Sequence, residues 1–139
     1  MNFTINTKGF TDIIDITDEV SQKVKESKIK DGICLISCPG STTGLTTIEY
    51  EEGALNDLKK VLEKIVPATK DYEHCKKWGD CNGYAHIRSA LIKPFLTVPI
   101  EDEKLVLGNW QQIVFLDFDN RPRKREVKIK IIKNYENKI

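Results

Sequence analysis

The chain of 139 residues has no long apolar run and no excess of charge. No window approaches the stretch of about 18 apolar residues that a membrane-spanning helix needs, and the first residues, MNFTINTKGF, lack the basic flank and apolar run of a secretion signal. Lys and Arg number 22 against 21 Asp and Glu, which leaves a net charge of +1. This balance argues against nucleic acid or an anionic membrane as the main partner. We therefore expect a cytoplasmic protein that binds neither.

Linkers rich in Pro, Gly and Ser, internal repeats and low-complexity tracts are absent as well. The length is that of one ordinary domain, so residues 1–139 are expected to fold around a single core. The chain has four cysteines, and in a cytoplasmic protein we expect them to be reduced and free of metal. Cys34 and Cys38 stand four apart in a strand-like run, hence on one face, and are expected to be small buried apolar side chains.

Helix signals occur at two places. Thr17, followed by two acids, is expected to cap a helix that carries Val20 and Val24 on one face. A second, amphipathic helix is expected over residues 53–66, with Pro67 beyond its end. Its apolar positions are spaced by three and four and must cover a sheet: Leu55, Leu58, Leu62 and Ile65.

Strand-like runs make up much of the remaining chain. Two short runs flank a turn at Lys8 and Gly9, and five more are expected near residues 33–38, 45–50, 95–100, 110–119 and 125–133. The last two would form an antiparallel hairpin through residues 120–123. Two main helices and about seven strands without βαβ alternation predict an α+β fold, a two-sheet β-sandwich.

The loop CPGSTTG brings Ser41, Thr42 and Thr43 together with two glycines. Backbone N–H groups in such a tight connection can cradle an anion. A hydroxyl-rich β-turn without any ligand is the alternative interpretation. The loop lacks the lysine and the following helix of a Walker A motif.

Residues 73–91, EHCKKWGDCNGYAHIRSAL, contain both histidines of the chain. His74, Cys75, Cys81 and His86 are a possible set of zinc ligands, but structural zinc sites pair their ligands two to four residues apart, and this spacing differs. Zinc is therefore not expected, and His74 is at most a weak metal candidate.

A second set in the same stretch is Asp80, Asn82, His86 and Arg88. A carboxylate and an amide before a short helix, with an imidazole and a guanidinium on it, can bind hydrated Mg²⁺ through Asp80 and a phosphate, while His86 acts as acid or base. In the alternative interpretation, Asp80 or Asn82 caps the helix and Arg88 forms a surface ion pair.

Three segments in this order, GSTTGLTTIEYEEG, GDCNGYAHIRSALIKPFLTVPI and LGNWQQIVFLDFDNRPRKREV, resemble the YjbQ-like family of small proteins, also named secondary thiamine-phosphate synthase enzymes. The resemblance covers nearly the whole chain. It implies a seven-stranded two-sheet sandwich, a homotrimer, and a site where the loop after Cys38 and Pro39 meets the N-G-x-x-H helix. In one branch of the family a histidine and an aspartate occupy the positions of Gly40 and Tyr84, which argues against a histidine-based metal site in this chain.

The family name implies that a pyrimidine diphosphate is joined to a thiazole phosphate with release of pyrophosphate. Arg88, the sole arginine before residue 121, would neutralise the pyrophosphate, and Tyr84 or Trp110 would stack on the pyrimidine cation. Catalytic roles would fall to Asp80, Asn82 and His86, and substrate binding to Ser41, Thr42, Thr43, Tyr84, Arg88 and Trp110. The alternative is a trimeric module that binds a phosphorylated metabolite without turnover.

Overall fold

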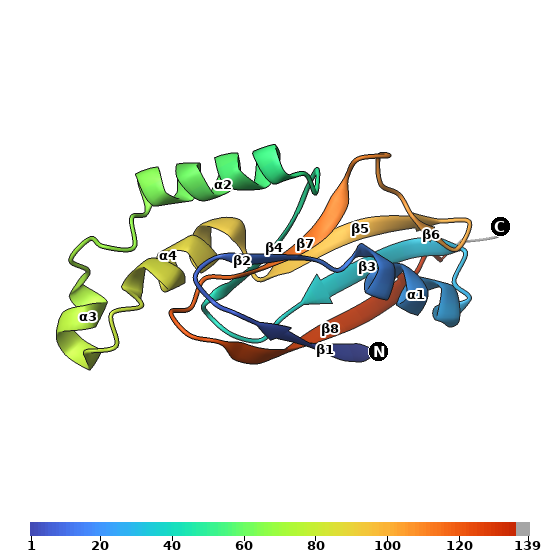
Figure 1. Ribbon diagram of the computed structural model, residues 1–139. Helices are drawn as coiled ribbons and strands as arrows, with labels where there is room; N and C mark the ends of the chain where they lie inside the picture. Colours follow the sequence, from blue (N-terminus) through green and yellow to red (C-terminus); the bar gives the residue numbers. More distant parts are fainter. Residues whose placement is uncertain (136–139) are drawn as a thin grey trace.

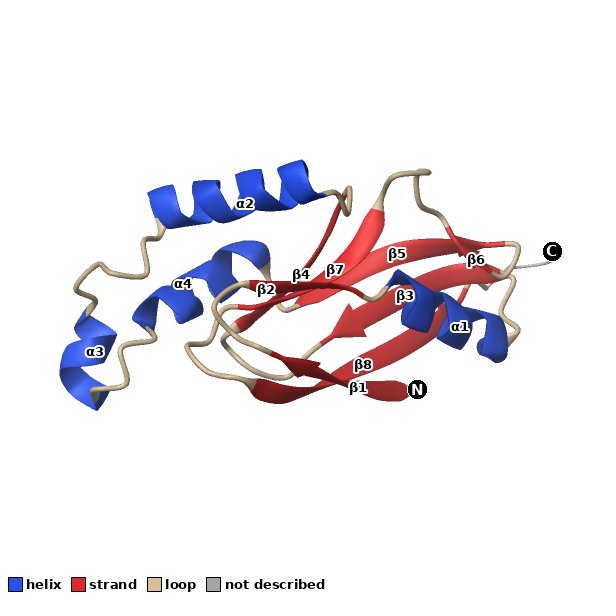
Figure 2. Cartoon of the chain, in the orientation of Figure 1, coloured by secondary structure: helices blue, strands red, loops and turns tan. Residues whose placement is uncertain are grey.

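The computed structural model describes residues 1–135, which form eight strands and four helices (Figure 1 and Figure 2). The elements in chain order are β1 (Asn2–Thr7), β2 (Asp12–Asp15), α1 (Thr17–Ser27), β3 (Asp31–Ser37), β4 (Thr43–Ile48), α2 (Glu52–Ile65), α3 (Glu73–Trp78), α4 (Gly83–Ile92), β5 (Phe95–Glu101), β6 (Lys104–Leu105), β7 (Gln112–Asp117) and β8 (Arg123–Lys133). The predicted α+β class is confirmed. The strand count is eight instead of seven because Lys104–Leu105 pairs with the end of β5 across a tight turn.

The strands form two antiparallel sheets, one of five strands in the order β1-β8-β3-β5-β6 and one of three in the order β2-β7-β4. The predicted hairpin between β7 and β8 is wrong, since these strands lie in different sheets. In the small sheet, β2 pairs with one edge of β7 and β4 pairs with the other. In the large sheet, β8 lies between β1 and β3. With no free edge beside β7, the chain leaves this sheet after Asp117 and crosses to the other.

The turn at Lys8 and Gly9 is a second crossing of the same kind, because it joins β1 of the large sheet to β2 of the small one. Gly9 has a φ of +76°, and a Cβ there would stand 2.5 Å from the Arg121 carbonyl oxygen. The backbone N–H of Thr11 donates to the Asp117 carbonyl oxygen at 2.8 Å. The two crossings therefore pack against each other at one end of the sheets.

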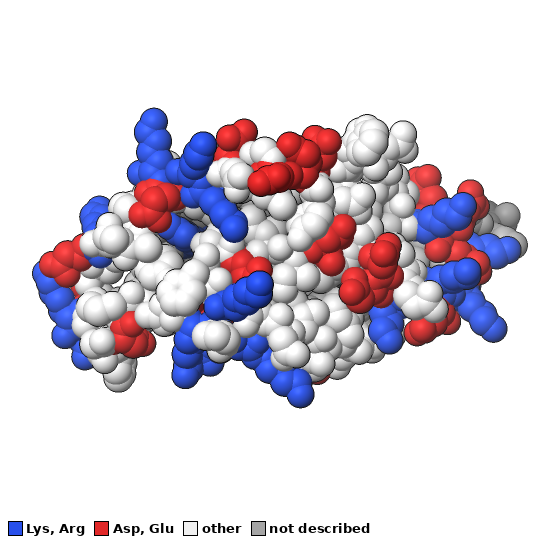
Figure 3. Space-filling model, viewed as in Figure 1, with Lys and Arg blue, Asp and Glu red and all other residues white. Residues whose placement is uncertain are grey.

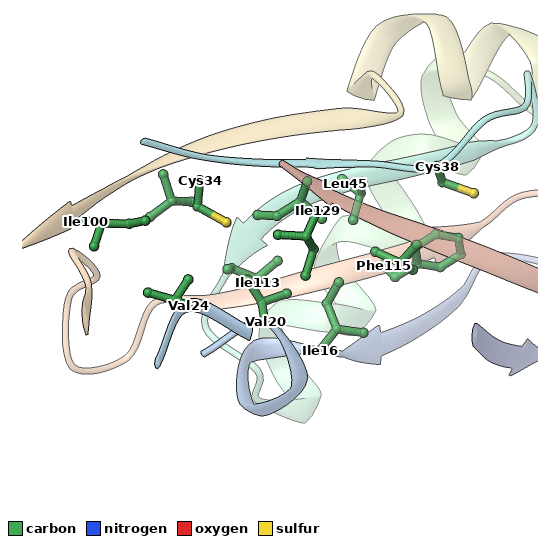
Figure 4. Packing of buried hydrophobic residues seen from close by; sticks show 13 residues of the cluster. Ile16, Val20, Val24, Cys34, Cys38, Leu45, Ile100, Ile113, Phe115 and Ile129 are labelled. Atoms are coloured by element: carbon green, nitrogen blue, oxygen red, sulfur yellow. The ribbon is translucent and has the colours of Figure 1, made fainter. Parts of the chain in front are cut away.

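The space between the two sheets, together with α1, holds the larger apolar core (Figure 4). Val20 and Val24 of α1 are fully buried in it, as predicted. Cys34 and Cys38 are free, buried thiols in the same cluster, which confirms their expected role. Burial raises the pKa of the Cys34 thiol to about 11, so this thiol stays protonated at neutral pH.

A second apolar core lies between the small sheet on one side and the helices α2 and α4 on the other (Figure 1). Ile113 and Phe115 of β7 face the first core, and Val114 and Leu116 face the second. Because β7 is buried on both faces, its apolar run is nearly continuous. The small sheet is thus a middle layer between the large sheet and the helices.

The amphipathic helix α2 ends before Pro67, as predicted. Leu62 is buried and Leu55 and Leu58 pack beside it, but Ile65 is 60% exposed. Val66, one residue further on, points into the core in its place. The change arises because the chain leaves the helix at Ile65 and turns toward α3.

The helix α1 begins at Thr17, although its N-cap is Ile16. The Thr17 hydroxyl donates to Asp15 Oδ1 at 2.6 Å and accepts from the Ile113 N–H at 2.8 Å. Thr17 therefore ties the start of the helix to β7 instead of capping it.

On the face shown in Figure 3, basic and acidic side chains are interspersed, and acidic ones gather over the N-terminal end of α2. Within the described residues no helix combines the length and apolar character needed to cross a bilayer.

Candidate functional site

The structure brings the loop before β4 against the first turns of α4. Nδ1 of His86 lies 3.1 Å from the carbonyl oxygen of Ser41, and the Ser89 hydroxyl donates to the Thr43 carbonyl oxygen at 2.6 Å. A carbonyl oxygen can only accept, so in neutral His86 the proton is on Nδ1 and the lone pair is on Nε2. The loop thereby selects the tautomer in which Nε2 can take up a proton.

His74, from α3, lies beside His86, with ring centroids 4.6 Å apart and planes tilted by 53°. Nδ1 of His74 is buried without a hydrogen bond and lies 3.5 Å from Oδ1 of Asp80. Asp80 is about half exposed. The two imidazoles and this carboxylate thus lie together at the rim of α4.

Asn82, the N-cap residue of α4, is buried and donates from Nδ2 to Oδ1 of Asp119 at 3.2 Å. Ionised carboxylates only accept hydrogen bonds, so this contact fixes the orientation of the amide and leaves Oδ1 as the free end. Oδ1 of Asn82 has no donor among the described residues. A buried acceptor of this kind is suited to an N–H or O–H group of a ligand or to a bound water.

Asp119 is itself buried at the N-terminal end of α4. Burial alone raises the pKa of its carboxyl, but hydrogen bonds from Arg123, Asn82 and the Asn120 N–H together hold the pKa below its ordinary value. The carboxylate therefore stays charged and keeps Asn82 in place.

Arg125 of β8 is a site residue that the sequence analysis missed. Its Nε and Nη2 atoms donate to both oxygens of Asp117, at 2.8 and 3.0 Å, and Nη2 also donates to the Thr42 hydroxyl at 2.8 Å. Nη1 takes part in none of these bonds. It faces Gly40, and a Cβ built on Gly40 would stand 3.7 Å from Nη1. Val127 and Ile129 point inward from β8. Because strand side chains alternate with a period of two, the sequence could have predicted that Arg125, two residues before Val127, lies on the same inner face.

Arg88 differs from its expected position. It is 4% exposed, and its guanidinium donates to Thr11, Glu63 and twice to the Val66 carbonyl oxygen, at 2.8 to 3.0 Å. His86 and Arg88 are two residues apart, roughly 200° around the helix, so they point to nearly opposite sides. Arg88 therefore joins α4 to α2 and to the β1–β2 crossing and does not face the loop at Ser41.

The two aromatic candidates also lie away from His86. Tyr84 is buried in the second core, with the Arg88 guanidinium 5.1 Å from its ring centre. Trp110 is 74% exposed and lines a cavity of about 400 Å³ with Tyr50 and Glu49. In the ladder between β4 and β7, Thr43 pairs with Asp117 at one end and Ile48 with Gln112 at the other, which puts Trp110 roughly 17 Å or more from the loop.

The three loop hydroxyls have different environments. Ser41 is exposed, Thr42 accepts from Arg125, and the Thr43 hydroxyl is buried without a partner within residues 1–135. Ser41 is thus the hydroxyl open to solvent, and Thr42 is braced by the arginine.

Cys75 and Cys81 form a disulfide, so the expectation that all four cysteines are reduced is wrong for this pair. The left-handed Gly79 at the end of α3 turns the chain back and brings the two Cα atoms to 4.2 Å. Their sulfurs are then unavailable as zinc ligands. Among the described residues no three His, Cys, Asp or Glu side chains gather as a metal site.

Comparison with known proteins agrees with this fold. The family model described as UPF0047 protein YjbQ-like matches residues 1–134. A UPF0047 protein of Archaeoglobus fulgidus is 41% identical over 132 residues, which span 95% of this chain and 100% of that protein. The UPF0047 protein YugU of Bacillus subtilis is 35% identical over 129 residues, spanning 92% and 95% of the two chains.

Solved structures show the same likeness. The crystal structure of an uncharacterized YjbQ/UPF0047 protein from Clostridium acetobutylicum superposes with a TM-score of 0.86 at 35% identity, over 95% of this chain and 99% of that one. A YbjQ-like protein of unknown function from Sulfolobus solfataricus gives a TM-score of 0.87 at 28% identity, over 96% and 97%. The chain therefore belongs to the YjbQ-like UPF0047 protein family.

Proposed function

We propose that the protein is an enzyme that binds a phosphorylated small molecule between residues 40–43 and the start of α4. One arrangement carries this proposal: three polar groups that have no hydrogen-bond partner within residues 1–135 adjoin the same short loop and helix end. They are the lone pair on Nε2 of His86, Oδ1 of Asn82 and the Nη1 donors of Arg125.

The anion would be held by Arg125 and by the N-terminal end of α4. Asp117 fixes the guanidinium in one orientation through two hydrogen bonds, and a charge-assisted bond from Nη1 is stronger than a neutral one. The helix α4 has no side-chain cap and no acidic residue in its first turn. Its first N–H groups can therefore donate to a negative ligand group, while the Asp119 carboxylate beside Asn82 offsets part of the positive dipole.

His86 would transfer the proton. An imidazole can both accept and release a proton, and the bond to Ser41 presents Nε2 as the basic atom. His74, in ring contact with His86, stabilises its position and, through Asp80, links the pair to a carboxylate.

The specific reaction that we propose to assay is the thiamine-phosphate synthase reaction. Departure of pyrophosphate from the pyrimidine diphosphate makes anion stabilisation the main requirement. Arg125 takes the role first expected of Arg88. Asp80, half exposed at the rim, would hold a hydrated Mg²⁺, which binds proteins through one or two carboxylates together with substrate phosphates and would add positive charge there.

Replacing His86 with Gln is expected to lower turnover of the two phosphorylated substrates by about 10²–10⁴-fold, while pyrophosphate binding persists. Turnover is measured by product formation and binding by calorimetry. As a control, Trp110→Phe, at the far end of β7, should change neither quantity. Binding without turnover in the unmodified protein would identify the non-catalytic alternative, and absence of both would overturn the proposal.

We also propose a homotrimer, supported by the outer face of the five-stranded sheet. Ile33, Phe95 and Ile132 are 46%, 53% and 60% exposed there, and Ile33 is the register neighbour of Pro99 and Ile132. Exposed apolar side chains that adjoin one another, as those of Ile33, Pro99 and Ile132 do, are typical of an interface.

Light scattering at micromolar concentration is expected to give three times the chain mass of 15.9 kDa. Ile33→Lys should lower this mass by placing a charge in the interface. The matched control Ile65→Lys, on the exposed side of α2, should leave the mass unchanged. A monomer mass for the unmodified protein would contradict the assembly.

A further inference from the structure

The short helix α3 has little packing of its own. None of the residues from Glu73 to Trp78 is buried. Its main contact with the rest of the protein is a close approach to α4, where a Cβ on Gly83 would stand 2.7 Å from Cβ of Tyr72 and 3.3 Å from Cβ of His74. In Figure 1, α3 forms the extreme end of the molecule, away from both sheets.

The disulfide supplies the second attachment. Cys81 directly precedes Asn82, the N-cap of α4, so the bond to Cys75 joins α3 covalently to the start of the helix that carries His86. It closes a loop that contains Trp78 and Asp80. A cross-link of this kind limits how far His74, adjacent to Cys75, can move from His86.

The bond is accessible to solution thiols. Cys81 is exposed and Cys75 partly exposed, whereas the other two cysteines are buried in the core between the sheets. Thiol–disulfide exchange requires access to a sulfur atom, and exposed disulfides are typically the labile ones. Exchange should therefore be confined to this pair.

We propose that Cys75 and Cys81 form a reversible thiol–disulfide switch that sets the position of His74 against His86. In the forward step, a thiolate of an external dithiol attacks one sulfur and displaces the other as a thiolate. The second thiol of the reagent then releases the first sulfur. The protein gains two electrons and two protons as two thiols, and the reagent becomes a disulfide.

Opening the bond would leave α3 attached to α4 by noncovalent contacts, at Gly83 and between the His74 and His86 rings, and by the chain through residues 79–82. His74 would then lose its fixed place 4.6 Å from the His86 ring, together with its approach to Asp80. His86 would keep its bond to Ser41, since both residues lie outside α3. The consequence for catalysis rests on the proposed function, but the movement of His74 does not.

The first test counts reactive thiols in the folded protein. After treatment with oxidised dithiothreitol, a pulse of iodoacetamide should label no cysteine. After reduction with dithiothreitol it should label Cys75 and Cys81 and leave Cys34 and Cys38 unmodified, as peptide mass mapping would show. If the pair does not form a disulfide with the oxidant, or if all four cysteines react alike, the proposal is wrong.

The second test follows the two histidines by the Cε1–Hε1 signals in NMR spectra without any ligand, assigned with His74→Gln. Reduction should shift the His74 signal strongly and the His86 signal to a smaller extent. The double variant Cys75→Ser, Cys81→Ser should show the reduced spectrum with or without dithiothreitol. Identical spectra of the oxidised and reduced protein would overturn the switch.

Pyrophosphate calorimetry and the product-formation assay, carried out on the oxidised and the reduced protein, then separate the proposed function from the proposed switch. A difference in affinity or turnover between the forms supports control of the site. Shifted histidine signals without pyrophosphate binding in either form would refute the proposed function and leave the switch of α3 standing. Equal binding and turnover in both forms would refute its regulatory role.

Discussion

Replacing Arg88 with Ala is expected to lower the free energy of unfolding by about 3–5 kcal/mol. Arg88 is buried, and its guanidinium supplies hydrogen bonds to the Val66 carbonyl oxygen, the Thr11 hydroxyl and Glu63. Alanine leaves the first two acceptors without a donor and empties the space beside the Tyr84 ring. Urea unfolding followed by circular dichroism measures the change.

Two matched variants show where this loss originates. Arg121→Ala removes an exposed arginine from the β7–β8 crossing and should change stability by no more than about 0.5 kcal/mol. Glu63→Gln neutralises the half-exposed carboxylate that pairs with Arg88 and should cost about 1 kcal/mol or less. If Arg88→Ala were as stable as the unmodified protein and bound pyrophosphate more weakly, Arg88 would be a ligand residue and our account of it would be wrong.

Replacing Asp117 with Ala is expected to cost a similar amount, about 3–5 kcal/mol. The fully buried carboxylate accepts from the Thr7 hydroxyl at 2.6 Å, from Arg125 at 2.8 and 3.0 Å, and from the Asp119 N–H at 3.1 Å. Alanine removes the nearer counter-charge of the Arg125 guanidinium, whose side chain is 11% exposed, and leaves the Asp119 carboxylate at 3.8 Å from Nη2 as its remaining partner. Removing one partner of a buried, hydrogen-bonded ion pair is among the larger destabilising single changes.

The same substitution also tests the site, since Asp117 orients Arg125. At temperatures where the variant is still folded, pyrophosphate binding should be lost together with stability. Asp57→Ala, on the exposed side of α2, is the matched control and should be within about 0.5 kcal/mol of the unmodified protein. A variant at Asp117 with unchanged urea midpoint and unchanged binding would show that the pair with Arg125 has neither role.

Local features of the fold could be predicted from the sequence, because they depend on neighbours along the chain. The spacing of Leu55, Leu58 and Leu62 placed α2 and its buried side, and the pair Val20 and Val24 did so for α1. The alternation around Cys34 and Cys38 placed both thiols inside. The family motifs indicated the YjbQ-like family, which the comparisons confirmed.

The roles of the charged residues required the tertiary structure. Arg88 and Arg125 are both basic residues near apolar positions in the sequence, yet the first fills a buried network while the second lies under the loop at Gly40. Which role each takes depends on partners that are 8 to 83 residues away in the chain. The disulfide is similar, because its formation depends on how Gly79 turns the chain.

By itself the sequence determined the main helices, most of the strands, the buried sides of α1 and α2 marked by Val20, Val24 and Leu62, and the family, since periodicity and motifs are properties of short segments. It did not indicate the helix α3 or the two-residue strand β6. The tertiary structure alone decided that β7 and β8 belong to different sheets, that Arg125 and not Arg88 adjoins the loop, and that Cys75 meets Cys81. The physical reason is that the two-residue period of a strand determines the face of each side chain but not its neighbouring strand. Strand partners are selected by which edges remain free once the two cores are closed.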